Sequence, residues 1–169
     1  TYTMEQAEQN TRGYVAEVVQ LADPDYDFSQ YDNDGPDNVP NSGDDDGFVD
    51  GIIVVYSGCG AEVNEGNNNI WPHQSSLYND QYQTNDPSAN GGYVIVNTYA
   101  VCPELSGGGD CWTNQIRPIG VYAHEFGHIL GLPDLYDRDD SSAGIGSWCL
   151  MASGSHNGQM GTTPAHMSV

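Results

Sequence analysis

The segment from His124 to Asp134, HEFGHILGLPD, constrains the fold more than any other part of this sequence. Its two histidines stand four positions apart, and residues with that spacing lie one above the other on the same face of an α-helix. Apolar side chains at helical spacing continue through residues 116–132, and Pro118 suits a first helical turn. Gly131 can adopt a positive φ and turn the chain out of the helix, which would return Asp134 to the two histidines. The segment therefore predicts a helix, an abrupt turn and a point where three side chains meet.

These residue types suit a single metal ion. Two imidazoles and a carboxylate form an accepted ligand set for zinc, and a catalytic zinc keeps one further position open for water. In the H-E-x-x-H pattern the glutamate acts as the general base on that water. We therefore predict that His124, His128 and Asp134 are zinc ligands and that Glu125 is the catalytic residue. Two alternatives for Asp134 remain open: it caps the helix exit, or it binds calcium together with Asp137, Asp139 and Asp140.

A glycine- and serine-rich segment, GIGSWCLMASGS, follows the motif. Its Met151 offers a soft, polarisable side chain that suits an apolar floor beneath a metal, although ordinary core packing would use the same residue. No tyrosine follows Met151 directly, so support for the negative charge of a transition state would come from the metal or from another residue. His156 is one candidate for that support, and a surface histidine is the simpler interpretation.

The negative charge of the chain is concentrated in one segment. The formal net charge is −21, and ten of the 17 aspartates fall between Asp23 and Asp50. Alternating oxygen donors followed by a glycine and a further carboxylate suit calcium, which takes roughly 6 to 8 oxygen ligands. Two partial loops of this kind predict a structural calcium site with the ligands Asp32, Asp34, Asp44, Asp46 and Asp50. The alternative is an acidic, solvated loop, but consecutive aspartates would repel one another in a chain whose lysines and arginines total only 3.

Composition also limits the partners and the compartment. Nucleic acids and anionic membranes need basic surfaces, so a chain with this charge is not expected to bind either. No stretch approaches the roughly 20 apolar residues of a membrane helix, and no signal sequence is visible at the first residues. We expect protein or peptide partners and, by default, a monomer. The even number of cysteines and the acidic balance suggest an oxidising, extracellular setting.

The four cysteines allow three pairings. Cys102 and Cys111 flank a short flexible loop, PELSGGGD, and this is the pairing that we favour. Cys59 with Cys149 would then follow by elimination.

At 169 residues the chain is most simply one domain, residues 1–169. Hydrophobic periodicity predicts an amphipathic helix at 3–23, buried strands at 51–58 and 92–101, and the motif helix within 116–132. Residues 60–92 are expected to form a long polar connection, which is unusual in a compact domain. Two strands and two helices are few for an α/β unit of this length, so we expect that flanking segments are missing at both ends.

The motif and the methionine segment together resemble the metzincin clan of zinc peptidases, and within it the secreted immune inhibitor A family of bacterial metallopeptidases. The resemblance includes DDDGFVDGIIVVYSGCGAE, IWPH, VCPELS and TTPAHMSV, and it spans roughly residues 25–169. It implies a metzincin-like α/β (α+β) fold, in which a twisted sheet packs on the active-site helix and Met151 lies beneath the zinc. It also implies calcium in the acidic segment, where related chains run the two half-loops together.

These observations predict a secreted zinc endopeptidase that hydrolyses peptide bonds. The rival hypothesis is a calcium-stabilised binding or adhesion module with a non-catalytic zinc site. The two differ at Glu125, because only an enzyme needs that carboxylate.

Overall fold

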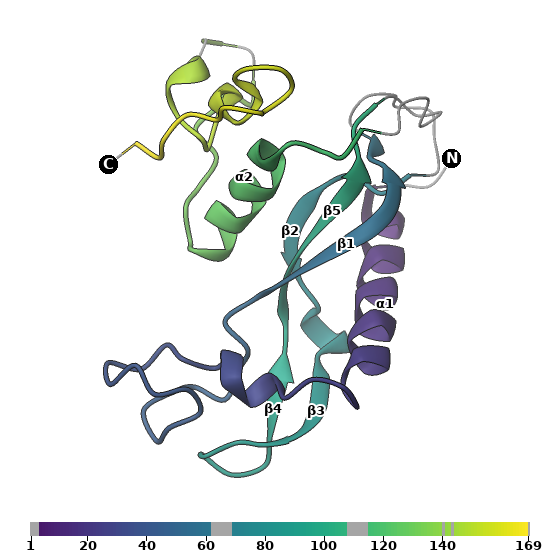
Figure 1. Ribbon diagram of the computed structural model, residues 1–169, viewed down its shortest axis with the longest axis vertical. Helices are drawn as coiled ribbons and strands as arrows, with labels where there is room; N and C mark the ends of the chain where they lie inside the picture. Colours follow the sequence, from purple (N-terminus) through teal and green to yellow (C-terminus); the bar gives the residue numbers. More distant parts are fainter. Residues whose placement is uncertain (1–3, 62–68, 108–114, 140, 143, 169) are drawn as a thin grey trace. The chain divides into compact units, whose positions relative to one another are not determined.

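A computed structural model of the chain describes residues 4–61, 69–107, 115–139, 141–142 and 144–168 (Figure 1). The chain divides into two compact units, residues 1–54 with 75–100 and residues 55–74 with 101–169, and each unit is described by itself. The helices and strands are α1 (Met4–Ala22), β1 (Ile52–Cys59), β2 (His73–Ser76), β3 (Tyr82–Pro87), β4 (Tyr93–Val96), β5 (Thr98–Leu105) and α2 (Ile119–Ile129). This mixture of helices and strands confirms the α/β class in its general form. None of the described helices is both long and apolar enough to cross a membrane.

In the first unit, α1 packs against β3. The helix occupies almost the predicted range. Thr11, Val15 and Val19, at i, i+4 and i+8, are buried, whereas Leu21 is 73% exposed. Val94 and Val96 of β4 are also fully buried, so the apolar core of this unit includes residues of the helix and of the strand that pairs with β3.

Strands β3 and β4 form an antiparallel hairpin with a shift in register between Gln83 and Pro87. The sequence had predicted no strand within 60–92, because β3 is polar. Its polar side chains are nevertheless paired inside the unit: the hydroxyl of Thr84 donates to the carbonyl of Val94 at 2.9 Å, and Asn85 donates to Asp23. Hydrogen bonding therefore offsets the cost of burying the Thr84 hydroxyl, and it holds the exposed Asn85 on Asp23, neither of which periodicity detects.

The predicted strand at 92–101 is two strands, β4 and β5, interrupted at Asn97. A three-stranded sheet has the order β1-β5-β2, so β5 lies at its centre. The residues of β5 from Tyr99 to Pro103 are all buried, as expected for a strand covered on both sides. Strand β1 instead alternates, with Val55 52% exposed, so the prediction of a fully buried strand at 51–58 was wrong.

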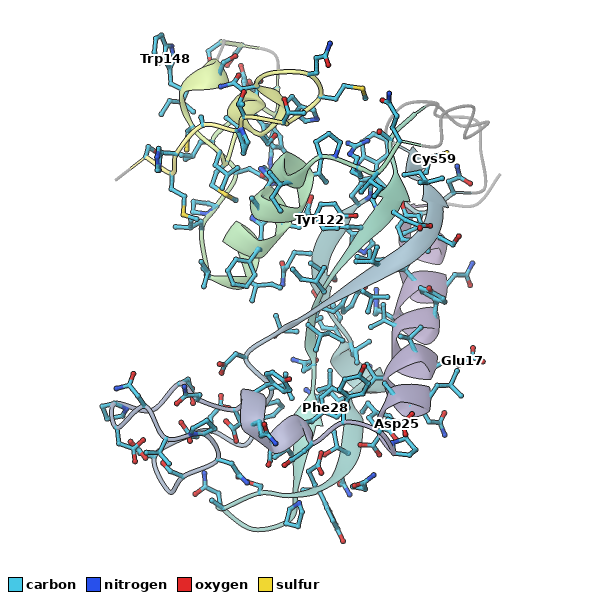
Figure 2. The ribbon with its side chains drawn as sticks, viewed as in Figure 1. Glu17, Asp25, Phe28, Cys59, Tyr122 and Trp148 are labelled. Atoms are coloured by element: carbon cyan, nitrogen blue, oxygen red, sulfur yellow. The ribbon has the colours of Figure 1, made fainter. Side chains whose placement is uncertain are left out.

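In the second unit, the chain after α2 returns over the N-terminal end of that helix (Figure 1). The amide of Gly120 donates to the carbonyl of Gly161 at 3.0 Å, and a Cβ at Gly120 would overlap the carbonyl oxygen of Ser155. This close backbone approach requires glycine. The returning segment contains two 3-10 turns, η4 (Gly146–Trp148) and η5 (Ser153–His156), and Figure 2 shows Trp148 projecting from the first of them.

The cysteine pairings predicted from the sequence are both wrong. Cys59 is disulfide-bonded, whereas Cys102 and Cys149 are buried and outside any disulfide; Cys111 lies outside the described residues. Cys102 is a fully buried residue of β5 rather than a loop residue. The sulfur of Cys149 accepts hydrogen bonds from the backbone amides of Met151 in its own turn and of Ser168, 19 positions later.

Candidate metal centre

Helix α2 ends in a turn that depends on Gly131. Gly131 has φ = +84°, its amide donates to the carbonyl of His128 at 2.9 Å, and the amide of Leu132 donates to the carbonyl of Gly127 at 3.0 Å. These two bonds form a Schellman motif, in which a glycine in the left-handed region reverses the chain. The predicted turn out of the helix is therefore confirmed.

The turn brings Asp134 back to the two histidines. Its Oδ1 atom lies 3.2 Å from His124 Nε2 and 3.1 Å from His128 Nε2. Two ligands about 2.0–2.1 Å from one tetrahedral zinc ion are separated by about 3.3 Å, so these separations fit a shared metal. The three side chains predicted to meet do meet.

The other ring nitrogen of each histidine is held by a backbone carbonyl. Nδ1 of His124 donates to Leu150 O at 2.9 Å, and Nδ1 of His128 donates to Leu132 O at 2.8 Å. With the proton on Nδ1, the lone pair of each neutral imidazole is on Nε2, the atom that faces Asp134. The two rings are therefore oriented as metal ligands before any metal arrives.

The carboxylate of Asp134 has two unlike oxygens. Oδ2 accepts hydrogen bonds from the hydroxyl of Tyr136 at 2.9 Å and from the guanidinium of Arg138. Oδ1 is buried and accepts no hydrogen bond from the described residues. Burial raises the pKa of Asp134, but the bonds from Arg138 and Tyr136 and the adjacent histidines outweigh it and lower the pKa below its ordinary value. An ionised, buried oxygen without a donor is what a cation at this point would satisfy.

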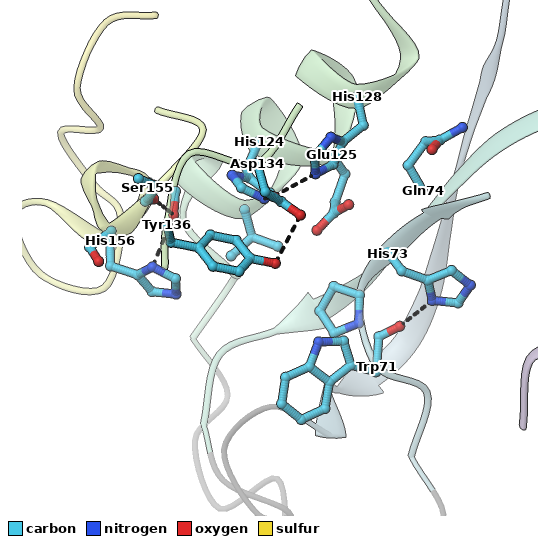
Figure 3. A pocket seen from close by; sticks show the side chains of 14 residues that line it. Trp71, His73, Gln74, His124, Glu125, His128, Asp134, Tyr136, Ser155 and His156 are labelled. Carbon is cyan, nitrogen blue, oxygen red and sulfur yellow. Dashed lines mark hydrogen bonds and ion pairs between the residues drawn. The ribbon is translucent and has the colours of Figure 1, made fainter. Parts of the chain in front are cut away.

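Glu125 follows His124 on α2 and is only 7% exposed. Burial raises its pKa above the ordinary value; the nearby histidines and a backbone hydrogen bond from Gln74 act in the opposite direction, and Asp134 adds to the rise. Figure 3 shows its carboxylate directed into the same cavity as the three candidate ligands.

The cavity in front of these residues has a volume of about 520 Å³. Trp71 and His73 lie across it from α2, and Tyr136, Ser155 and His156 form another part of its wall (Figure 3). Its lining residues are Trp71, Pro72, His73, Gln74, Val121, His124, Glu125, His128, Asp134, Tyr136, Ala152, Ser153, Ser155 and His156.

Met151 lies against α2 at Gly127. It is 1% exposed, and a Cβ at Gly127 would overlap its sulfur. The buried cluster of Cys149, Leu150 and Met151 also packs on Ala123, one helical turn before Gly127. Met151 therefore packs on the helix that carries the two histidines, and its role as an apolar floor beneath a metal stays a prediction.

In the first unit, three aspartates of the acidic segment lie together: Asp32, Asp34 and Asp45 each offer an oxygen within 4.8 Å of the others. Asp32 is 1% exposed, and its Oδ1 has no hydrogen-bond partner among the described residues. Burial raises the pKa of Asp32 to about 6, and the neighbouring carboxylates add to the rise, although a backbone hydrogen bond from Gly47 opposes it.

The other candidate calcium ligands have partners of their own outside that cluster. Asp44 accepts a hydrogen bond from the hydroxyl of Ser42, Asp46 accepts from the amide of Phe48 at 2.8 Å, and Asp50 accepts from the amide of Asn33 at 3.3 Å. Asp137 and Asp139 accept bonds from amides of their own loop, and Asp140 lies outside the described residues. The sequence did not single out Asp45.

Comparison with known proteins identifies the family. A family profile described as immune inhibitor A peptidase M6, catalytic domain, matches residues 2–169. The chain belongs to the peptidase M6 family. The resemblance found in the motifs is thereby confirmed, and membership of this metallopeptidase family implies a metal ion.

Two similar proteins support the assignment of this chain to the M6 family. Immune inhibitor A from Bacillus thuringiensis subsp. alesti is 34% identical over 153 residues, which cover 83% of this chain and 20% of the relative. Pre-pro-metalloprotease PrtV from Vibrio cholerae serotype O1 (strain M66-2) is 31% identical over 169 residues, which cover 91% of this chain and 17% of the relative. The chain thus spans a fifth or less of the length of these relatives.

Sequence reasoning missed two residues of this M6 site, Tyr136 and Arg138. Both donate to Asp134 Oδ2, and the ring of Tyr136 also stacks on His124 with centroids 6.4 Å apart. A signal was present, since Arg138 is one of only three basic side chains in the chain and follows the third ligand at i+4.

Proposed function

We propose that this chain is the catalytic domain of a secreted zinc endopeptidase that cleaves protein or peptide substrates. The observation that carries the proposal is the meeting of His124 Nε2, His128 Nε2 and the donor-free Asp134 Oδ1 beside a buried glutamate. Family membership supports the hydrolase class, and the names of the Bacillus and Vibrio relatives support a protease. The "pre-pro" in the Vibrio name supports secretion, and the fold proposed for residues 1–169 is metzincin-like, with Met151 as its apolar floor.

In this proposal, His124, His128 and Asp134 would hold a zinc ion beside the cavity. Bound zinc supplies Lewis acidity, which lowers the pKa of water from about 15.7 to roughly 7 and polarises a carbonyl group. The carboxylate of Glu125 takes the proton of the attacking water and returns it to the leaving amine nitrogen. Burial of Glu125 suits both steps, because a raised pKa makes a carboxylate a better base and keeps the proton available for transfer.

The rival is a binding module that keeps the zinc but performs no chemistry. It explains the two histidines and Asp134, but it gives no reason for a 7% exposed carboxylate at Glu125 that faces the same cavity. Burying a carboxylate costs free energy, and a module that only binds gains no activity in return for that cost. This cost favours the enzyme.

The test compares Glu125→Gln with the matched variant Glu104→Gln, which changes an exposed glutamate of β5 in the same unit. The intact protein is assayed for cleavage of casein, with and without a zinc chelator, and its zinc content is measured by atomic emission. We expect Glu125→Gln to retain zinc and to lose activity by at least about 10²–10⁴-fold, the usual contribution of a general base. A zinc-loaded wild-type protein that cleaves nothing, or a Glu125→Gln variant as active as Glu104→Gln, would refute the proposal.

For the acidic segment we propose a structural calcium ion held by Asp32, Asp34 and Asp45. The support is the donor-free, buried Oδ1 of Asp32 within a group of three carboxylates, because hard oxygen ligands suit calcium. The ion would compensate the negative charge that Asp34, Asp45 and Asp46 exert on Asp32. Asp44, Asp46 and Asp50 remain candidates for contacts made through water.

A further inference from the structure

The two oxygens of Asp134 are treated differently by the residues around them. Oδ1 faces the two imidazoles and accepts no hydrogen bond from the described residues, while Oδ2 accepts bonds from both Tyr136 and Arg138. We propose that Tyr136 and Arg138 are positioning residues that force Asp134 to bind the metal through Oδ1 alone. The inference rests on the proposed function and concerns the same site.

The reason that such positioning is needed lies in the carboxylate itself. The terminal torsion of an aspartate is broad and roughly two-fold, so a carboxylate without other partners can present either oxygen or both to a cation. If both oxygens of Asp134 bound, the carboxylate would take up the position that a catalytic zinc keeps open for water. Two donors on Oδ2 remove that option, because they hold this oxygen away from the imidazoles.

Tyr136 is held in place by more than its hydroxyl. Its ring stacks on that of His124 with an interplanar angle of 22°, and the guanidinium carbon of Arg138 lies 5.8 Å from the ring centroid. The tyrosine therefore contacts one ligand through its ring and another through its hydroxyl (Figure 3). A phenylalanine at this position would keep the ring contact and lose only the bond to Oδ2.

Arg138 differs from Tyr136 in exposure. Its side chain is 72% exposed, so solvent and salt weaken its attraction to Asp134. Its guanidinium is nevertheless one of only three basic groups in a chain with a net charge of −21. We expect Tyr136 to set the geometry of the carboxylate and Arg138 to add a contribution that depends on salt.

The experiment uses the intact protein and four variants: Tyr136→Phe, Arg138→Gln, Arg138→Lys and the control Tyr122→Phe. Tyr122 lies on α2 (Figure 2), and its hydroxyl donates to the carbonyl of Pro103 at 2.6 Å, so the control loses one hydrogen bond without touching Asp134. Zinc affinity is measured by competition with a chromophoric chelator at low and high salt. Coordination is followed from the visible spectrum of the cobalt(II)-substituted protein, whose absorption weakens when a fifth ligand binds.

We expect Tyr136→Phe to weaken zinc binding by about 10-fold or more, within the usual 10–100-fold effect of losing such a partner of a ligand. Its cobalt spectrum should lose intensity, because Oδ2 is released to bind as a fifth ligand. Arg138→Gln should show a smaller loss that disappears at high salt, and Arg138→Lys should restore part of it. Tyr122→Phe should leave the zinc affinity and the cobalt spectrum unchanged.

The possible results distinguish a failure of the positioning role from a failure of the proposed function. If the wild-type protein binds zinc and Tyr136→Phe matches Tyr122→Phe in zinc affinity and in cobalt spectrum, the positioning role is wrong and the proposed function stands. If the wild-type protein binds no zinc, the proposed function fails and this inference fails with it.

Discussion

The close approach of α2 to η5 makes Gly120 the most informative position for a stability test. The proposed change is Gly120→Ala. The added Cβ would overlap the carbonyl oxygen of Ser155 and would lie 2.9 Å from the Cα of Gly161. Both obstacles are backbone atoms, so no side-chain rotation can relieve them.

The size of the effect follows from three contributions. Overpacking against atoms that cannot rotate away costs about 3 kcal/mol, the upper part of the usual range. Moving the backbone apart also weakens the hydrogen bond from the Gly120 amide to Gly161, at a cost of about 1 kcal/mol. Alanine offsets up to about 1 kcal/mol of this through its higher helix propensity. We therefore expect the free energy of unfolding to fall by about 3 kcal/mol, or about 6–12 °C in melting temperature.

The matched control is Gly13→Ala, in the middle of α1, where an added Cβ meets no atom within 4 Å. There only the helix propensity changes, so this variant should be more stable than the wild type by up to about 1 kcal/mol. Both variants are measured by urea denaturation with circular dichroism. The close backbone approach of α2 to η5 is disproved if Gly120→Ala proves as stable as Gly13→Ala.

Two further predictions concern the methionine floor and the acidic cluster. Gly127→Ala places a Cβ on the sulfur of Met151, a flexible side-chain end, so it should cost only about 1 kcal/mol, and this cost should vanish in a Met151→Ala background in a double-mutant cycle. Burial raises the pKa of Asp32 to about 6 from 3.8 in a model peptide, so the fold loses stability as the pH rises from 3.8 to 6, and the full loss is present above pH 6. The metal-free protein should therefore regain roughly 3 kcal/mol from this group as the pH falls from about 7 to 4. Calcium, which needs the ionised form, should raise the melting temperature at pH 7 but not at pH 4. Asp32→Asn should remove the calcium response at pH 7 and Asp46→Asn should keep it; the reverse order would contradict the assigned ligands.

The meeting of the three candidate metal ligands could be predicted from the sequence because its geometry is local. The spacing of His124 and His128 follows from helix periodicity, and the return of Asp134 follows from the left-handed conformation that Gly131 permits. All of these residues fall within one short segment, so no long-range contact has to be known in advance. The backbone carbonyls of Leu132 and Leu150, which orient the two rings, could not be identified in this way.

The strands were harder to predict because their stabilising partners are distant in the sequence. Asn85 of β3 bonds to Asp23, which lies 62 positions earlier. A polar strand of this kind has no apolar alternation, so only the tertiary structure shows that its side chains are satisfied. The same limit explains why the cysteine pairings were predicted wrongly. The short segment between Cys102 and Cys111 suggests a loop, but only the fold shows that Cys102 lies in a buried strand.

The acidic segment shows a different limit of prediction from the sequence. Asp44, Asp45 and Asp46 are consecutive, and their composition alone does not reveal which of them turns inward. Asp45 does so because its two oxygens accept the amides of Gly35 and Ser42, each at 2.7 Å, and these bonds bury it to 4% exposure next to Asp32. Backbone amides therefore select the inward carboxylate, and an oxygen already bonded to one amide still has a lone pair for a cation.

By this argument Asp45→Asn should weaken calcium binding for two reasons. It removes a negative charge, and it places an amide NH₂ against a backbone donor. The loss of affinity should then exceed that of Asp34→Asn in a calcium titration, and equal losses would mean that the amide bonds to Asp45 do not order the site.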